Sequence, residues 1–378
     1  AQLAAANHAC YDSALRGEFT ALLLPFSRHL GIESCLISLL NGATVVTIAN
    51  LHVPTFMEAI ELYEARVAYT SPYIVHLITQ QASPPATPAV ASAATANGSA
   101  PVPEPSLSSA SGTSIVAAPV HALNLPTENG NGITPPNTHE FTLASLQTLI
   151  VGTASLTRLT HDRFIKRFPH VRIVTIYGMT ETGIITRSAP RSRHAKTVGT
   201  LAAGLQLKVL DMLSGQELGV REKGLIYVAG PSTSAPYLDH QEMNPFGGWR
   251  KTGDIGFFDE DEQIHLIDRA KDMIKVFGYQ VTPQEIEEVL ATHAAVSECA
   301  VVGVGDVIAG ERPVAYVVLR PLHKVTKEEL LEFVNVRVNS IKQLGRVEIA
   351  QRLPRTACGA VLRRVLSEAA NLSITNAR

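Results

Sequence analysis

Hydroxyl, carboxylate and aromatic side chains occur together in YGMTETG, residues 177–183, directly after an apolar run typical of a buried strand. Backbone amides in such a loop, together with the Thr180 hydroxyl, can hold phosphate oxygens. The Glu181 carboxylate can bind Mg²⁺, and the Tyr177 ring offers a flat face for a nucleobase. The same pattern also fits an ordinary Thr-capped turn with a solvated glutamate, so the loop alone indicates no single chemistry.

Two further segments combine turn residues with charge. In RKTGDIG, residues 250–256, Asp254 follows a glycine and can accept hydrogen bonds from two vicinal hydroxyl groups, such as those of a ribose. The same segment also suits an ordinary β-turn. In DRAKDMIKVFGYQVTPQEIEEV, residues 268–289, Arg269 follows a predicted strand. A solvated linker is the alternative interpretation of that charge run.

The fourth segment, PRTACGAVLRRV (residues 354–365), is a glycine-containing turn among positive charges. Such a turn is a good place to receive an anion. The residue at its tip, Ala360, has no functional group. The turn is therefore either a plain lead-in to a helix or a site that has lost its reactive side chain. The surrounding arginines are Arg355, Arg363 and Arg364.

Predicted strands and helices must position these four segments. The first of them occupy residues 20–80, where the sequence has an α/β pattern. Two apolar runs, ALLLPF and ATVVTIA, precede PTFMEAIELYEARV, whose apolar residues recur at helical spacing. Strand, helix and strand in this order predict an α/β layer. Helical periodicity places three side chains of the last segment on one face: Phe56, Ile60 and Tyr63.

Residues 82–140 differ in composition from everything around them. They are mostly Pro, Ala, Ser, Thr, Asn and Gly, with few aromatic or large aliphatic residues. Because such a stretch cannot bury enough apolar surface to offset the entropy lost on ordering, we expect a disordered surface insertion. After it, strand and helix patterns resume. Residues 197–267 contain short β-type runs separated by Gly, Pro and Asp turns, which predict a compact β-rich subdomain.

Past Asp268 the pattern becomes α+β. We therefore predict a domain boundary there, between residues 1–267 and residues 268–378. Two capping boxes predict helix starts in the second domain, one at residues 282–285 and one at residues 326–329. The first also carries a proline at the first helical position, where proline is favoured.

The composition narrows the function classes. The chain has 378 residues, of which 46% are hydrophobic, and a net charge of -2, so nucleic acid and anionic membrane are not expected partners. The four cysteines are scattered without a CxxC pair, which indicates free thiols of an intracellular protein. The most apolar stretch, residues 22–49, is interrupted by charges and a proline, so no membrane span is predicted. The final TNAR is not the usual peroxisomal tripeptide, so we expect a cytoplasmic location.

In this order and at these separations, the four segments resemble the adenylate-forming superfamily. The resemblance is greatest to acyl-CoA synthetases of the 4-coumarate–CoA ligase-like type. GTASL at residues 152–156 and RFP at residues 167–169 add to it, and it runs from about residue 20 to residue 366, apart from the insertion. The family implies an α/β fold: a large α/β main domain with a small β subdomain, here partial, followed by a small mobile α+β domain.

The resemblance also implies a reaction and its ligands. In that family, a carboxylate attacks the α-phosphate of ATP to give an acyl-adenylate and pyrophosphate, and the thiol of coenzyme A then takes the acyl group. A small carboxylic acid, ATP/AMP, Mg²⁺ and coenzyme A are the implied ligands. Tyr177 would stack on adenine, Thr180 would contact the α-phosphate and Glu181 would bind Mg²⁺. Asp254 and Arg269 would contact the ribose hydroxyls.

Further site residues follow from the same resemblance. Lys271 would lie at the hinge between the domains, and Gly278 would line the tunnel of the thiol. The GTASL segment matches the adenine loop of the family. The implied contacts to nucleotide and thiol are Thr153, Ala154, Ser155, Tyr177, Gly178, Met179, Thr180, Asp254, Arg269 and Gly278.

The chain departs from the family pattern at functionally important places. No Gly/Ser/Thr-rich phosphate loop ending in Lys is found, and since the sequence begins at Ala1, we expect the N-terminal part of the main domain to be absent. The family turn reads PRTxSGK, and its Lys bridges carboxylate and phosphate where this chain has Ala360. Losing such a charge typically costs about 3–4 kcal/mol, or about 10²–10³ in rate. Arg363 or Arg364 is expected to replace it only in part.

Three substitutions in the walls of the site are smaller departures. Ser155 stands where the family usually has Pro. Ile176 occupies a position that is usually Gly, which would shorten the acyl pocket and favour a smaller acid. Arg28 replaces a common His and would favour a second anionic group on the substrate.

Three hypotheses therefore stand. The first is an ATP-dependent acid–CoA ligase with impaired adenylation. The second is a non-catalytic descendant that binds nucleotide, acyl-adenylate or CoA, or acts as an interaction partner. The third, an adenylation module of a peptide or polyketide synthetase, is disfavoured because the chain ends soon after RRVL without a carrier domain. The sequence indicates neither the acid nor the oligomeric state.

Overall fold

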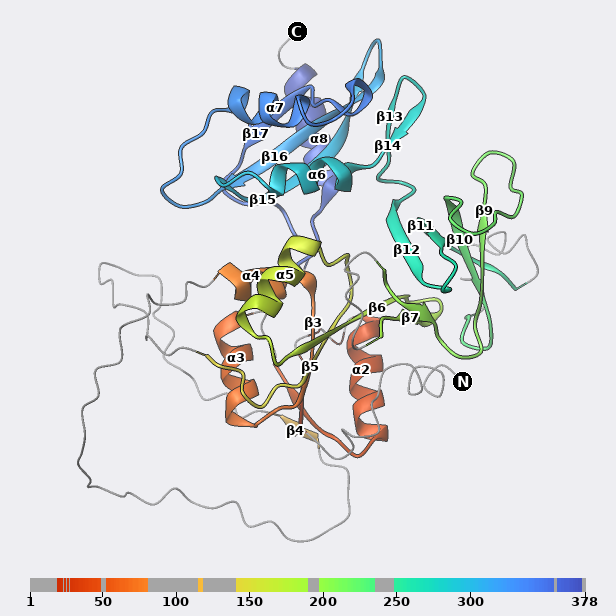
Figure 1. Cartoon of the computed structure of the whole chain (residues 1–378), viewed down its shortest axis with the longest axis vertical. Coiled ribbons are helices and arrows are strands. Elements are labelled where there is room, and N and C mark those ends of the chain that lie inside the picture. The colour runs from red at the N-terminus through yellow and green to blue at the C-terminus, as the bar shows by residue number, and fades with distance from the viewer. Residues whose placement is uncertain are drawn as a thin grey trace.

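The structure is a computed structural model that describes residues 19–22, 24, 26, 28–48, 52–80, 115–117, 141–189, 197–234, 248–356 and 359–375. The described strands form three sheets of eight, four and five strands. Figure 1 shows the eight-stranded sheet and its helices in the lower half, the four-stranded sheet beside it, and the five-stranded sheet above. The expected α/β main part followed by an α+β part is confirmed.

The first sheet has the strand order β4-β2-β1-β3-β5-β6-β7-β8. The pairs from β4 to β6 are parallel, and β6–β7 and β7–β8 are antiparallel. Parallel neighbours need crossover connections, which here contain helices. The strands are β1 (Phe19–Leu22), β2 (Thr44–Thr47), β3 (Val67–Thr70), β4 (Ile115–Ala117), β5 (Thr148–Val151), β6 (Arg172–Met179), β7 (Gly183–Arg187) and β8 (Thr200–Leu201).

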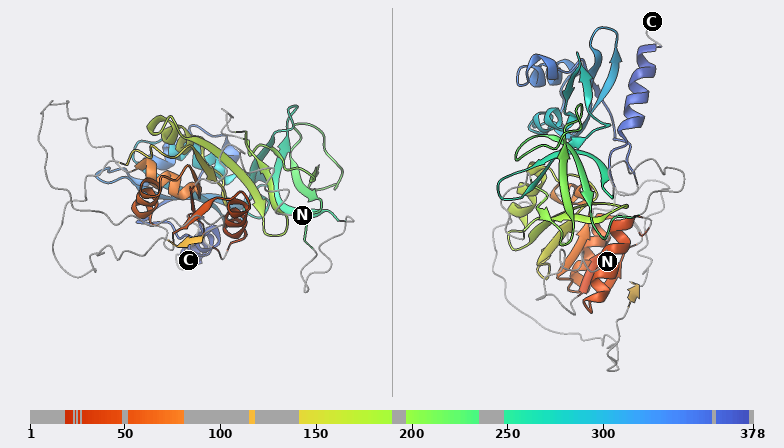
Figure 2. Two further views of the ribbon diagram at one scale, coloured as in Figure 1. Left: turned by 90° about the horizontal axis from the view of Figure 1, so that it is seen from below. Right: turned by 90° about the vertical axis from the view of Figure 1, so that its right-hand side faces the viewer.

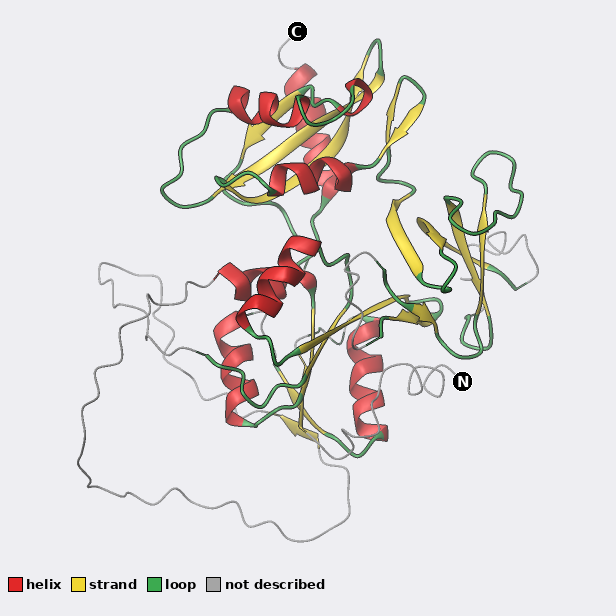
Figure 3. Ribbon diagram, viewed as in Figure 1, coloured by secondary structure: helices red, strands yellow, loops and turns green. Residues whose placement is uncertain are grey.

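Helices cover both faces of this sheet, as the red ribbons of Figure 3 show. They are α2 (His29–Leu40), α3 (Val53–Leu62), α4 (Pro72–Gln80) and α5 (Arg158–Arg167). The alternation of side chains along a strand divides the core between the faces. In β5, Leu149 and Val151 pack with α3, α4 and α5, whereas Ile150 packs with α2. All-buried strands such as β3 and β5 are typical of a sheet covered on both sides.

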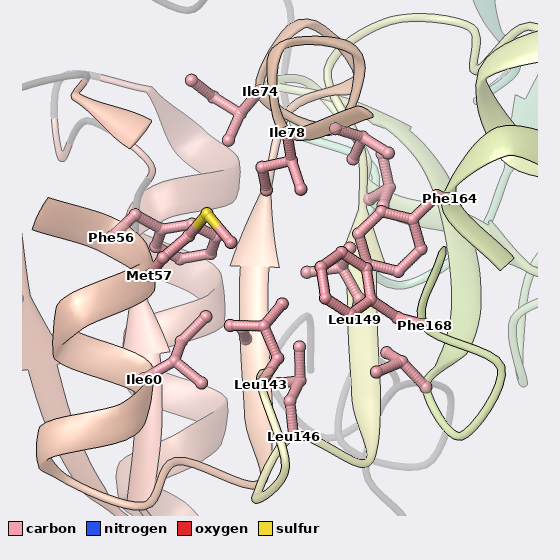
Figure 4. Close-up of a cluster of buried hydrophobic side chains, with 14 of the residues drawn as sticks. Phe56, Met57, Ile60, Ile74, Ile78, Leu143, Leu146, Leu149, Phe164 and Phe168 are labelled. Carbon is pink, nitrogen blue, oxygen red and sulfur yellow. The ribbon is translucent and has the colours of Figure 1, made fainter. Parts of the chain in front are cut away.

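The larger of the two cores lies between α3, α4 and α5 (Figure 4). Its aromatic side chains are Phe56 of α3 and Phe164 of α5, both fully buried, and Phe168 at the end of α5. The rings of Phe164 and Phe168 lie 5.1 Å apart and are tilted against each other. The predicted helical face is confirmed for Phe56 and Ile60, which both point into this core. Tyr63 is not part of it, because this residue lies just past the end of α3 and is only half-buried.

The second sheet is antiparallel, with the order β12-β11-β10-β9. Its strands are β9 (Gln206–Leu210), β10 (Gly224–Ala229), β11 (Arg250–Phe258) and β12 (Ile264–Arg269). The expected β-rich subdomain, residues 197–267, contains most of these strands, but β8 pairs with β7 of the first sheet. Asp268, the predicted domain boundary, lies within β12, and residues 270–273 connect this sheet to the third.

The third sheet carries the C-terminal α+β lobe, with the order β14-β13-β16-β15 and β17 paired with β16. Figure 2 shows from the side that the C-terminal helix stands along this lobe. The strands are β13 (Ile274–Val276), β14 (Tyr279–Val281), β15 (Val296–Asp306), β16 (Gly310–Leu319) and β17 (Arg346–Ile349); the helices are α6 (Pro283–Ala291), α7 (Lys327–Asn335), η3 (Ser340–Lys342) and α8 (Arg363–Thr375).

One of the two predicted capping boxes is wrong. At α7, the Thr326 side chain accepts from the backbone of Glu329 and the Glu329 side chain accepts in return, as predicted. At α6, Thr282 is the N-cap and a proline follows, but the Thr282 side chain makes no capping hydrogen bond. Glu285 instead forms an ion pair with Lys342, 2.7 Å away. A long-range partner has therefore replaced the local one.

The predicted disordered insertion, residues 82–140, lies outside the described residues except for β4. There the prediction is wrong: Ile115–Ala117 pairs in parallel with β2. The short run IVA supplies two β-branched residues, which suit a strand. None of the helices in the described ranges combines the length and apolarity that a bilayer crossing requires.

Candidate functional site

Three of the predicted site residues meet where the first and second sheets adjoin. Tyr177 is near the end of β6, and Asp254 and Arg269 are directly opposite each other in the antiparallel pair β11–β12. The Tyr177 hydroxyl donates to Oδ2 of Asp254 at 2.6 Å. Nε of Arg269 lies 3.4 Å from Oδ1 of the same carboxylate. Residues far apart in sequence thus surround one carboxylate.

The Asp254 carboxylate is largely withdrawn from water, with 12% of its side chain exposed. Burial raises the pKa of Asp254 above its ordinary value, and the hydrogen bond from Tyr177 and the charge of Arg269 oppose that rise. Burial, followed by the nearby Asp254 charge, raises the pKa of Tyr177 well above 10. Tyr177 therefore stays a hydrogen-bond donor. A carboxylate has about four acceptor positions, so Asp254 retains capacity for further donors.

The turn between β6 and β7 holds the two residues expected at the phosphates. Thr180 is exposed and Glu181 is half-buried. The turn is closed by the backbone bond from Thr182 N to Met179 O, and Glu181 O accepts from Ser234 N at 2.7 Å. Thr180 lies three positions after Tyr177 in the chain. The turn therefore places the Thr180 hydroxyl and the Glu181 carboxylate directly beyond the contact between Tyr177 and Asp254.

Sequence reasoning missed a buried acid beside this turn. Glu33 of α2 is only 4% exposed, and its Oε2 lies 3.6 Å from Nε2 of His29, one helical turn earlier. Burial raises the pKa of Glu33 to about 7. Burial also lowers the pKa of His29, while the charge of Glu181 raises it. The available signal was a His and a Glu at i,i+4 spacing within an otherwise apolar helix.

The loop expected to contact adenine follows β5. Its residues Thr153, Ala154 and Ser155 are exposed. Directly before them, Gly152 is buried under two side chains: a Cβ atom added to Gly152 would lie 2.6 Å from Cδ2 of Leu30 and 2.9 Å from Cγ1 of Ile176. Leu30 and the 5%-exposed Ile176 therefore close over this glycine. The expected shortening of an acyl pocket by Ile176 stays a prediction.

The remaining predicted residues lie on the segment that leads into the third sheet. Lys271 is exposed in the connection after β12, and its charge acts to lower the pKa of Asp254, which places it near the carboxylate. Gly278 lies in the exposed turn between β13 and β14. The structure thus groups Lys271 with the Asp254 cluster and places Gly278 in the C-terminal lobe.

The turn that carries Ala360 is internally bonded. Thr356 N donates to Ala360 O at 2.8 Å, and Ala360 N donates to the Thr356 hydroxyl oxygen at 3.2 Å. The arginines that were expected to replace the missing lysine in part are directed elsewhere. Arg363 forms a bidentate ion pair with Glu287 inside the C-terminal lobe and also donates to a backbone carbonyl of β15. Arg364 is exposed on α8, 3.6 Å from Glu368. This geometry argues against their expected role.

The three-sheet fold is similar to that of solved adenylate-forming enzymes. The structure of ATP-bound MatB from Rhodopseudomonas palustris has a TM-score of 0.77, at 22% identity, over 98% of this chain and 64% of that chain. The anthranilate CoA ligase AuaEII in complex with anthranoyl-AMP has a TM-score of 0.75, at 20% identity, over 99% of this chain and 64% of that chain.

The sequence assigns the family. The AMP-binding enzyme model matches residues 2–238, and the AMP-binding enzyme C-terminal domain model matches residues 285–360. The chain therefore belongs to the AMP-binding enzyme family, as the sequence resemblance predicted.

The curated relatives are acid–CoA ligases by name. Peroxisomal OPC-8:0-CoA ligase 1 of Arabidopsis thaliana is 33% identical over 234 residues, which cover 60% of this chain and 43% of that protein. 4-Coumarate–CoA ligase 1 of Glycine max is 33% identical over 242 residues, 61% of this chain and 83% of that protein. The chain thus spans less than half the length of the first of these relatives. The predicted cytoplasmic location stays a prediction.

Proposed function

We propose that this chain serves acid–CoA ligation: adenylation of a small carboxylic acid by ATP, followed by transfer of the acyl group to coenzyme A. Adenylation would be weakened by Ala360. The observation that supports the proposal most is the convergence of Tyr177 and Arg269 on the Asp254 carboxylate. The names of the relatives, which are CoA ligases, point to the same reaction.

The nucleoside half of ATP would bind at Asp254. Its two oxygens would accept hydrogen bonds from the vicinal ribose hydroxyls, with Arg269 limiting the charge repulsion toward the phosphates. The Tyr177 ring would stack on adenine, and its orientation is already fixed by the 2.6 Å bond from its hydroxyl to Asp254. Because these groups are held before the ligand arrives, little ordering entropy remains to be lost on binding.

The phosphates would bind at the turn after β6. Thr180 would donate its hydroxyl to the α-phosphate, and Glu181 would hold Mg²⁺, which supplies positive charge to the phosphate oxygens when bound. One carboxylate on a solvent-accessible turn suits a cation that keeps several of its waters. A carboxylate oxygen of the acid would attack the α-phosphorus, and pyrophosphate would leave. The thiol sulfur of coenzyme A would then attack the acyl carbon, and AMP would leave.

Ala360 leaves this reaction without one expected charge. A lysine in that position would bridge the attacking carboxylate and the phosphate, and a methyl group provides neither charge nor hydrogen bond. The expected loss is about 3–4 kcal/mol, or about 10²–10³ in the adenylation rate. The ion pair that holds Arg363 to Glu287 supports the view that no neighbouring arginine compensates.

The packing around Gly152 favours a short acid. Leu30 and Ile176 approach this glycine so closely that neither leaves room for an added methyl group. A long or branched acyl chain entering at this point would have to displace both side chains, and overpacking a filled core costs about 1–3 kcal/mol. We therefore infer a substrate of few carbon atoms beyond the carboxylate.

The missing charge at Ala360 and the filled space around Gly152 also favour the alternative, a non-catalytic protein that binds nucleotide, acyl-adenylate or CoA. An ATP–pyrophosphate exchange assay with short acids separates the two. Ala360→Lys is expected to raise exchange by about 10²–10³, and Ala360→Met, of similar length without the charge, is expected to leave it unchanged. If neither variant catalysed ATP–pyrophosphate exchange, the result would favour the non-catalytic binding protein. Full exchange with Ala360 itself would refute the role given to the lysine.

A further inference from the structure

One face of α4 contacts the C-terminal lobe. Its residues Tyr73, His76 and Gln80 follow one another at spacings of three and four, which places them on one side of the helix. The lobe meets this face with the start of β15 and with the turn that precedes α8. Figure 1 shows α4 at the boundary between the two parts. We refer to Tyr73, His76 and Gln80 as the α4 seat.

Tyr73 receives the turn that carries Ala360. The Arg355 guanidinium lies 4.1 Å from the centre of the Tyr73 ring, a distance at which a cation is attracted to the ring face. Gly359 lies against the same side chain: a Cβ atom added to it would be 2.6 Å from the Cβ of Tyr73. Gly359 also has a φ of 84°, which favours glycine. Any larger residue there would move the turn off Tyr73.

Arg355 connects this contact to the rest of the lobe. Its Nη2 lies 2.6 Å from Oε2 of Glu298 on β15, and its Nη1 donates to Gly359 O at 2.6 Å. The guanidinium is therefore fixed in its plane by two polar partners while its face covers the Tyr73 ring. Such a fixed fork is a property of arginine that lysine does not share.

Gln80 makes a second connection, and it depends on His76. Nε2 of Gln80 donates to the Ser297 hydroxyl oxygen at 2.9 Å and lies 2.7 Å from Nε2 of His76. An amide nitrogen carries two hydrogens, so it can serve both acceptors only if His76 Nε2 is unprotonated. Neutral His76 thus orients the amide that holds β15.

We propose that the α4 seat is the positioning surface that fixes the Thr356–Ala360 turn and β15 against the main lobe, and that protonation of His76 releases it. The consequence for adenylation rests on the function proposed above, because it requires the turn to act at the phosphates. The docking itself does not depend on that function.

The surroundings of His76 determine the direction of the pH effect. Burial lowers its pKa below the ordinary value of 6.5; Arg355, Arg163 and Arg320 lower it further, and Glu298 opposes them. When the lobe leaves the seat, Arg320, Arg355 and Glu298 all move away from His76, so their opposing effects on its pKa are lost together. His76 also regains access to water, which removes the largest cause of its lowered pKa. As the pH falls below 6.5, the undocked form therefore takes up a proton before the docked form does. Docking should weaken by about tenfold per pH unit until the lowered pKa is reached, and be independent of pH above about 7.

Energy transfer between two fluorophores can measure docking directly. We would attach them through unnatural amino acids at Glu58 of α3 and Glu368 of α8, which are both exposed. The unaltered protein should show high transfer at pH 7.5 that falls between pH 6.5 and 5.5. His76→Gln, which keeps an acceptor and cannot be protonated, should remove the pH dependence. The matched control His323→Gln, at an exposed histidine, should retain it.

Variants at Tyr73 separate positioning from folding. Tyr73→Phe keeps the ring and should dock normally, whereas Tyr73→Ala should lower transfer at pH 7.5 with unchanged circular dichroism. Transfer that is independent of pH in the unaltered protein, or equal in Tyr73→Ala and Tyr73→Phe, would overturn the proposal. In an Ala360→Lys background, Tyr73→Ala should lower the kcat of exchange and leave the KM for ATP unchanged. Normal docking without any exchange would instead count against the proposed function alone.

Discussion

Replacing Glu33 with glutamine should stabilise the protein at neutral and alkaline pH. The carboxyl is 4% exposed beneath the turn that follows β6, and His29, 3.6 Å away, has its own pKa lowered by burial. The pKa of Glu33 is raised from 4.5 to about 7 because its charged form is deprived of water. Glutamine has the same shape and remains neutral at every pH, so Glu33→Gln removes only the cost of ionisation.

The magnitude follows from the shift. The difference between about 7 and 4.5 is about 2.5 pH units, which corresponds to about 3 kcal/mol at 1.36 kcal/mol per unit. In the unfolded chain the carboxyl ionises near pH 4.5, but in the folded protein it keeps its proton until about pH 7. The folded state therefore binds the extra proton in this window, and stability is lost as the pH rises through it. The loss is nearly complete by about pH 8 and constant above it.

Chemical denaturation at pH 5 and pH 8, followed by circular dichroism, measures this difference. Between the two conditions, the free energy of unfolding of the unaltered protein should fall by about 2.5 kcal/mol relative to Glu33→Gln. Glu217→Gln, at an exposed glutamate, serves as the matched control and should follow the unaltered protein. If Glu33→Gln showed the same pH dependence as the unaltered protein, the inferred rise of the Glu33 pKa by burial would be wrong.

Two further predictions concern stability. Phe164→Ala should destabilise the protein by about 3–5 kcal/mol, because it empties the centre of the core beneath α5; Leu62→Ala, at a side chain 73% exposed, should change thermal unfolding far less. Thr326→Ala should cost about 1 kcal/mol by removing a formed cap, whereas Thr282→Ala should cost a few tenths at most, since that hydroxyl makes no capping bond. Equal losses in the two threonine variants, measured by denaturant titration, would contradict the assignment of the caps.

Much of the fold could be predicted because its determinants are local. Apolar spacing placed Phe56 and Ile60 on one helical face, and both are fully buried. The capping box at Thr326 formed because its partners lie within one turn of each other. The box at Thr282 did not form because Glu285 is paired with Lys342, from a segment more than fifty residues later in the chain. A rule that considers only neighbouring residues cannot predict the ion pair with Lys342.

Some residues of the candidate site could be predicted from the sequence, and others could be recognised only from the fold. Tyr177, Asp254 and Arg269 were identified because the segments that carry them, taken together, resemble a known family, and the sheets bring the three side chains together. Glu33 was missed, since a single acid in an apolar helix usually indicates an exposed face. Tyr73 and His76 gave no signal at all, because their meaning depends on residues of β15 and the Ala360 turn, which the fold places against them.

Direct binding of AMP tests most simply whether Asp254 organises a nucleotide site. Isothermal titration of the unaltered protein should show one site. Asp254→Asn should weaken it by at least about tenfold, since a hydrogen bond to a charged acceptor contributes about 1.5–3 kcal/mol. Asp211→Asn, at an aspartate in the turn after β9, should bind like the unaltered protein. Absence of AMP binding, or equal affinity in the Asp254 and Asp211 variants, would contradict the account.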